Sequence, residues 1–229
     1  MAHHNHRREM IAEFIGTFIL VFFGTSAVVT AKISAAGAPF TFLHYLAIGT
    51  AFGAALIVAA YTVGPISGAH LNPAVTIGLA AAKRLPKEKV LPYIISQCAG
   101  AIFASLVLLF LLGTKAYGLG ETTVGPLGLR EALGIEAALT ALLVFTVLGV
   151  TDKGAPTDFA GLIIGLYLAA SHMIGVPISG NSLNPARSLG PALLVRGPAL
   201  DQLVFVYFLA PVVGGIVGAV VYRWMKEEK

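Results

Sequence analysis

Six stretches free of Asp, Glu, Lys and Arg dominate the sequence and predict how the chain is organised. They cover residues 14–31, 33–82, 90–114, 137–151, 159–186 and 202–222. A helix needs about 20 mainly apolar residues to cross a bilayer. The second stretch is too long for one helix, so we divide it into a span at about 43–62 and a polar segment behind it. The fourth reaches spanning length only if its helix extends back through Glu136 to about Glu131. The pattern predicts six transmembrane helices.

The polar segment in the second stretch has a counterpart in the other half of the chain. PISGAHLNPAVTIG at 65–78 matches PISGNSLNPARSLG at 177–190, at an offset of 112 residues. Each half contains three predicted spans, and because three is odd, the second half starts on the opposite side of the membrane and runs inverted. We expect one domain, 1–229, with inverted repeats at about 8–115 and 128–229, in which Asn72 and Asn184 enter from opposite sides and meet near the midplane.

Each LNPA sequence is typical of a helix start, because Asn is a strong N-cap and Pro suits the first helical position. The two starts are formed by Asn72, Pro73, Ala74, Asn184, Pro185 and Ala186. Each predicts a helix of about ten residues, half a bilayer long. We expect the preceding PISGAH and PISGNS to be extended, with carbonyls that face water or protein, because an unpaired carbonyl is costly in lipid. Two such half-helices would direct positive dipole ends and the free asparagine NH₂ groups at the bilayer centre, where they would oppose a proton. Two ordinary surface helices are the alternative, which the duplication disfavours.

Composition and charge agree with a membrane protein. Apolar residues make up 57% and charged residues 11% of the chain, and the mean hydropathy is +0.85, whereas soluble domains contain about 25% charged residues. The net charge of +4 does not indicate nucleic acid, because the basic residues cluster at the chain ends and in short loops. With the N-terminus inside, ten of the 15 Lys and Arg fall on the cytoplasmic side, which predicts cytoplasmic termini. The single cysteine, Cys98, excludes a multi-cysteine metal site.

An intramembrane enzyme is the main alternative from another class. It would need a nucleophile–base pair or a metal cluster, and the motifs HExxH and GxSxG and a pair of intramembrane Asp residues do not occur. A purely adhesive membrane protein would not need Arg187 in its polar segment. We therefore expect no catalytic residue, no metal and no cofactor.

The paired PISGAHLNPAV and PISGNSLNPARS segments resemble the signature of the aquaporin, or major intrinsic protein, family. AEFIGTF and SQCAGA are similar to its first and third spans, and AFG, PYII and FAGLIIG resemble archaeal-type members. The resemblance covers nearly the whole chain. It implies an all-α membrane protein with six transmembrane helices and two re-entrant half-helices, which forms a homotetrameric channel in the cell membrane.

The resemblance also implies an arginine-bearing constriction at Phe52, His172, Asn181 and Arg187. A fixed cation at this depth must face water and carbonyls rather than lipid, and it repels cations. Phe and His leave an opening about one water wide, whereas glycerol channels of the family replace the histidine with a small residue and usually have Asp where Ser188 stands. We expect water permeation; glycerol, other small neutral solutes and dissolved gases are the alternative. Asn181 replaces the Cys or Thr of many water-selective relatives, which leaves the width of the opening undetermined.

Supporting residues complete the predicted site. Glu13 and Glu136 lie in the first span of each half, and the family comparison implies that each accepts hydrogen bonds from the nearby re-entrant loop; a proton relay is the alternative. The loop residues expected to supply carbonyls or support are Gly68, Ala69, His70, Gly180 and Ser182. His70 either lines the cytoplasmic half or braces its loop, and a role as a pH sensor is a further alternative.

Overall fold

The computed structural model describes the backbone of residues 2–227 and the side chains of residues 6–226, and these residues form helices and turns without a β-strand. Six of the helical segments have the length and apolar composition that crossing a membrane requires. They are α1 (Ala2–Ala35), α2 (Phe42–Ser67), α4 (Lys87–Leu112), α5 (Leu129–Val150), α6 (Ala160–Ser179) and α9 (Ala210–Glu227), the last preceded by a π-helical turn, Phe205–Leu209. The predicted six transmembrane helices are confirmed.

The helices α1 and α2 extend beyond the limits that the charge-free stretches predicted. The first begins at Ala2 rather than near residue 14, and α2 ends at Ser67 rather than near residue 62. The absence of charge marks the part of a helix that lies in hydrocarbon, whereas the helix itself continues until a cap ends it.

The expectation that PISGAH and PISGNS are extended throughout was wrong. Their first three residues form the last turn of α2 and of α6, and Gly68 and Gly180 then end these helices in the left-handed conformation, at φ 89° and 78°. A proline inside a helix removes only the one hydrogen bond to the residue four positions earlier, so Pro65 and Pro177 are tolerated within the last turn.

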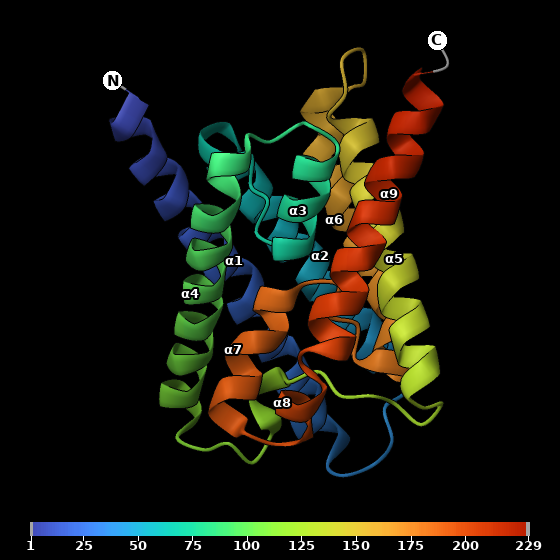
Figure 1. The fold of residues 1–229 in the computed structure, drawn as a ribbon. Coiled ribbons are helices and arrows are strands. Elements are labelled where there is room, and N and C mark those ends of the chain that lie inside the picture. The colour runs from blue at the N-terminus through green and yellow to red at the C-terminus, as the bar shows by residue number, and fades with distance from the viewer. Residues whose placement is uncertain (1, 228–229) are drawn as a thin grey trace.

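Two short helices begin at the duplicated motif. They are α3 (Pro73–Ala81) and α7 (Pro185–Val195), with 9 and 11 residues. Figure 1 shows them one above the other between the long helices, with α3 in the half of the molecule that contains the chain termini and α7 in the opposite half. The two halves of the chain thus contain the same series: two long helices, a short helix and a third long helix.

The long helices approach each other closely because glycines face neighbouring backbones. A Cβ added at Gly53 of α2 would lie 2.6 Å from the carbonyl oxygen of Gly165 in α6. The backbones of α2 and α6 are therefore in close contact at this point. A Cβ at Gly214 or Gly218 of α9 would lie 2.1 Å from a carbonyl oxygen of α5. In lipid, close backbone packing of this kind is a main source of helix association.

Several short elements were not predicted. They are the 3₁₀ turns Gly118–Gly120 and Thr157–Phe159 and the helix α8 (Pro198–Gln202). The first belongs to the segment 113–128 between α4 and α5, called here the 113–128 loop. It contacts α1 and α7 at the end of the molecule opposite the termini (Figure 1).

Candidate functional site

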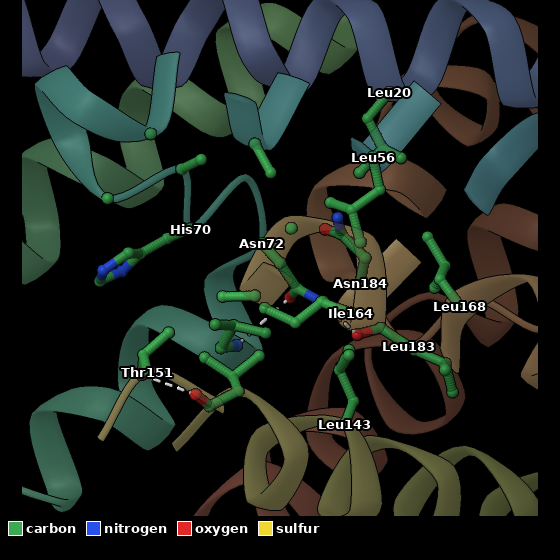
Figure 2. A pocket seen from close by; sticks show the side chains of 18 of the residues that line it. Leu20, Leu56, His70, Asn72, Leu143, Thr151, Ile164, Leu168, Leu183 and Asn184 are labelled. Atoms are coloured by element: carbon green, nitrogen blue, oxygen red, sulfur yellow. Dashed lines mark hydrogen bonds between the residues drawn. The ribbon is translucent and has the colours of Figure 1, made fainter. Parts of the chain in front are cut away.

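A cavity of about 350 Å³ extends from the start of α7 to the loop between α5 and α6. The candidate residues that line it are Phe52, Gly68, Ala69, His70, Asn72, His172, Ser182, Asn184 and Arg187. Figure 2 shows the two asparagines together near the centre of the pocket, surrounded by the aliphatic side chains of Leu20, Leu56, Leu143, Ile164 and Leu168. The cavity therefore combines a polar side, built from the re-entrant loops, with an apolar one.

The two asparagines bind the two re-entrant loops to each other. Asn72 Nδ2 donates to the carbonyl of Leu183 at 2.7 Å, and Asn184 Nδ2 donates to the carbonyl of Leu71 at 2.8 Å. Each side-chain oxygen accepts from the first turn of its own helix, as its N-cap position requires. The expectation of entirely free NH₂ groups is thus corrected. One N–H of each amide is bonded to the opposite loop, and the other remains available to the cavity.

The carboxylate of Glu13 holds the first re-entrant loop. It is fully buried and accepts from the N–H groups of His70 at 2.9 Å and Leu71 at 2.7 Å. The side chains of Ser67 and Gln97 donate to it at 2.7 Å each. The two carboxylate oxygens thus accept four hydrogen bonds. The buried charge is therefore fully hydrogen-bonded without water.

Glu136 holds the second loop in the same way. It is also fully buried, and it accepts from the N–H groups of Ser182 and Leu183 and from the hydroxyl of Ser179, each at 2.7 Å. Leu183 has a left-handed backbone at φ 52°, as Leu71 has at φ 54° in the first loop. Such a residue costs on the order of 1 kcal/mol, and a hydrogen bond to a charged acceptor offsets this by about 1.5–3 kcal/mol.

Three candidate residues from different helices meet at one end of the cavity. The rings of Phe52 and His172 stack with centroids 4.2 Å apart, and the guanidinium carbon of Arg187 lies 5.0 Å from the Phe52 centroid. Arg187 Nη1 donates to the carbonyl of Gly120 at 2.7 Å. All three side chains are at most 2% exposed.

The hydrogen bonds of His172 define its tautomer. Its Nδ1 lies 2.8 Å from the carbonyl of Leu168, and because a carbonyl only accepts, Nδ1 bears the hydrogen. In the neutral ring Nε2 is then an acceptor. His172 Nε2, an acceptor, and Arg187 Nε, a donor, are buried without a partner among the described residues, and both residues line the cavity.

The side chain of Asn181 turns away from Phe52 and His172. Its Nδ2 donates to Ser171 Oγ at 3.4 Å, and its amide lies where a Cβ of Gly175 would stand. Neither Asn181 nor Gly180 is among the described residues that line the cavity. The Asn181 side chain thus packs against α6, in space left by Gly175, instead of facing Phe52 and His172.

Several residues of the site were missed by sequence reasoning. The hydroxyls of Tyr93 and Tyr207 donate to the carbonyls of Ser67 and Ser179, the last residues of α2 and α6, at 2.9 and 2.8 Å. The Gly120 carbonyl was also missed, although the GLG run at 118–120 is the kind of turn signal that could have indicated it.

The residue after Gly120 is an acid, Glu121, whose side chain is partly buried. Burial raises the pKa of the Glu121 carboxyl, and the positive charge of Lys32 lowers it in part. Lys32 Nζ also donates to the carbonyl of Tyr117 at 3.1 Å, which links the 113–128 loop to α1.

Comparison with known proteins finds similarity along nearly the whole chain. The sequence profile described as Major intrinsic protein matches residues 1–222. The chain is 40% identical to Aquaporin Z of Bradyrhizobium diazoefficiens, over 96% of this chain and 94% of that protein, and 41% identical to Aquaporin Z of Rhodopseudomonas palustris, over the same shares. Among solved structures, that of the aquaglyceroporin from Plasmodium falciparum is similar, with a TM-score of 0.80 and 26% identity over 97% of this chain and 96% of that one. These relatives are not archaeal, so the likeness to archaeal-type members stays a prediction.

Proposed function

Because the chain belongs to the major intrinsic protein family, and is therefore a membrane channel rather than an enzyme, we propose that it conducts water passively in both directions and excludes protons and ions. The observation that supports this most directly is the meeting of Phe52, His172 and Arg187 at one end of a cavity that also contains both asparagines. In this proposal these three residues form the selectivity filter, and water passes along the re-entrant loops.

The filter suits water better than a larger solute. Two stacked rings and a guanidinium within 5.0 Å of one of them leave little width. His172 Nε2 accepts from a passing water, and Arg187 Nε donates to it. The apolar wall on the other side gives water few competing partners, which favours rapid passage.

Proton exclusion follows in this proposal from the two half-helices. Each directs its N-terminus, equivalent to roughly half a positive charge, at the same point. The remaining N–H of Asn72 and that of Asn184 bind one water oxygen, so its hydrogens point away from each other along the pore. Arg187 supplies a second positive barrier.

The setting of the channel is part of the same proposal. The positive-inside rule favours an orientation with both termini in the cytoplasm, and the family resemblance favours the cell membrane. The family resemblance favours a homotetramer, with membrane lipid around it. Glu13 and Glu136 act as scaffold for the loops rather than as a proton relay, since their oxygens are occupied by loop donors.

Glycerol is the second candidate solute. The observation in its favour is the structural similarity to an aquaglyceroporin. Dissolved gases and other small neutral solutes belong to the same alternative.

Osmotic shrinkage of proteoliposomes separates the candidates. Stopped-flow light scattering is measured against an impermeant sugar and against glycerol. We expect water permeability well above that of protein-free vesicles and glycerol permeability close to theirs. An equal rise in water and glycerol permeability over protein-free vesicles would support the glycerol alternative. Water permeability no higher than that of protein-free vesicles would contradict the proposed function.

A further inference from the structure

Three buried hydroxyl groups connect the 113–128 loop to the start of α7. Thr122 Oγ1 lies 2.7 Å from Ser188 Oγ, and Ser188 Oγ lies 2.6 Å from Ser182 Oγ. Ser182 Oγ in turn donates to the backbone carbonyl of Asn184 at 2.8 Å. The three hydroxyl-bearing residues are at most 2% exposed, so bulk water does not compete for these bonds.

Proton counting assigns every donor in this chain of hydroxyls. Each hydroxyl has a single hydrogen. The hydrogen of Ser182 is used on the Asn184 carbonyl, so Ser182 accepts from Ser188. The hydrogen of Ser188 is thereby used, and the contact with Thr122 requires Thr122 to donate. In this assignment the hydrogens point in one direction, from Thr122 through Ser188 and Ser182 to the Asn184 carbonyl.

The same two segments are joined a second time by Arg187. Its Nη1 donates to the carbonyl of Gly120, two residues before Thr122, and Arg187 directly precedes Ser188. The link from Thr122 to Ser188 therefore sets how far the Gly120 carbonyl stands from the helix that bears the arginine. The long arginine side chain has many rotamers, and the position of its acceptor selects among them.

We propose that Thr122 and Ser188 are positioning residues for Arg187. They hold the guanidinium at the point in the constriction where it rejects cations and solutes larger than water. The inference rests on the proposed function, in which Arg187 is part of the filter.

The identity of residue 188 matters in this arrangement. A carboxylate at position 188 only accepts hydrogen bonds. It would draw the hydrogens of both Thr122 and Ser182 to itself and release the Asn184 carbonyl. The chain of hydroxyls therefore requires a residue at 188 that both accepts and donates.

Proteoliposomes with Thr122→Val test the proposal. Valine keeps the shape and removes the donor. We expect the ratio of glycerol to water permeability and the proton leak to rise by about fivefold, the factor that corresponds to one ordinary hydrogen bond. Thr122→Ser keeps the hydroxyl and should restore both readings. Thr140→Val is the matched control, because Thr140 is equally buried but bonds only a carbonyl of its own helix, at 2.6 Å.

The outcomes separate this inference from the proposed function. If the unaltered protein does not accelerate water, the proposed function fails. If it does, and Thr122→Val leaves both readings unchanged or shifts them no more than Thr140→Val, the positioning role is overturned. Should Thr122→Val not reconstitute, Ser188→Ala interrupts the same series of hydroxyl hydrogen bonds. It is judged by the ratio of glycerol to water permeability and by the proton leak.

Discussion

At the scale of single residues, Arg187 illustrates how a cation is kept inside an apolar molecule. Its side chain is 2% exposed, and the Phe52 ring and the Gly120 carbonyl lie against its guanidinium. Burying an isolated cation is costly, so such a group is retained where it faces a polar path. Its Nε has no partner among the described residues, and the residue lines the cavity, which agrees with that position.

Removing this charge should open the channel to cations. For Arg187→Val we expect proton and sodium leak in proteoliposomes to rise by at least about tenfold, because the loss of a fixed cation at such short range lowers the barrier by more than about 1.4 kcal/mol. A fluorescent pH indicator inside the vesicles measures the proton leak, and a sodium-sensitive dye measures the sodium leak. Arg130→Gln is the control, since Arg130 has a side chain that is 93% exposed and lies away from the cavity. An Arg187→Val channel as tight as the control would remove Arg187 from the proposed barrier.

At the scale of elements, close packing of helices positions the site. The pairs α2–α6 and α5–α9 meet at glycines, and α6 presents His172 to Phe52 and Gly175 to Asn181. The half-helices α3 and α7 are too short to be stable alone. Their loops are held by buried carboxylates from α1 and α5, so these long helices determine where the half-helices begin.

The α5–α9 contact predicts a large difference between two glycine substitutions. Alanine favours a helix over glycine by about 1 kcal/mol. At Gly218, however, its Cβ would lie 2.1 Å from the backbone oxygen of Ala141, which cannot move without shifting the helix. We expect Gly218→Ala to lower stability by about 1–3 kcal/mol. Gly134→Ala should leave it unchanged or raise it, because nothing lies within 4 Å of a Cβ there. Thermal unfolding in detergent measures both, and equal midpoints would contradict the packing argument.

At the scale of the whole molecule, polar links tie the segments together at each end. At the end with the termini, Asp152 accepts from Lys226 at 2.6 Å and from the hydroxyl of Tyr222, and it lies 3.6 Å from Arg84. At the opposite end, Lys32 and Lys115 donate to carbonyls of the 113–128 loop and of α7. The charged residues thus connect loops and helix ends outside the apolar span.

The Asp152 link predicts a specific pH dependence. The hydrogen bonds from Lys226, Tyr222 and the Lys153 N–H hold the pKa of this carboxyl well below its usual value. A carboxyl whose pKa is lowered by folding stabilises the protein at every pH above its unfolded-state pKa. This stabilisation is lost only as the pH falls through the folded-state pKa. Between about pH 5 and 8 the contribution of Asp152 is therefore constant. We expect Asp152→Asn to lower the thermal midpoint by the same amount at about pH 5 and at about pH 8. A lower midpoint at about pH 8 alone would contradict the lowered pKa of Asp152.

The sequence by itself determined the six spans, the two half-helices and the family. These depend on local or duplicated signals: runs without charge, an Asn-Pro helix start that occurs twice, and the motifs around it. It also identified Glu13 and Glu136 as the acidic residues of the first span in each half, and each of them is bonded to a re-entrant loop. Such signals are readable because hydrocarbon excludes unpaired polar groups wherever the segment lies in the chain.

Only the tertiary structure decided the orientation of the polar groups. The reciprocal bonds of Asn72 and Asn184, the Gly120 carbonyl at Arg187 and the turn of Asn181 toward Gly175 differ from or go beyond the predictions. The first two join residues 67 or more positions apart, and the third depends on the missing side chain of Gly175, six residues before Asn181. A side chain selects its partner from what packing brings within hydrogen-bond distance, and that is a property of the assembled helices rather than of any one segment.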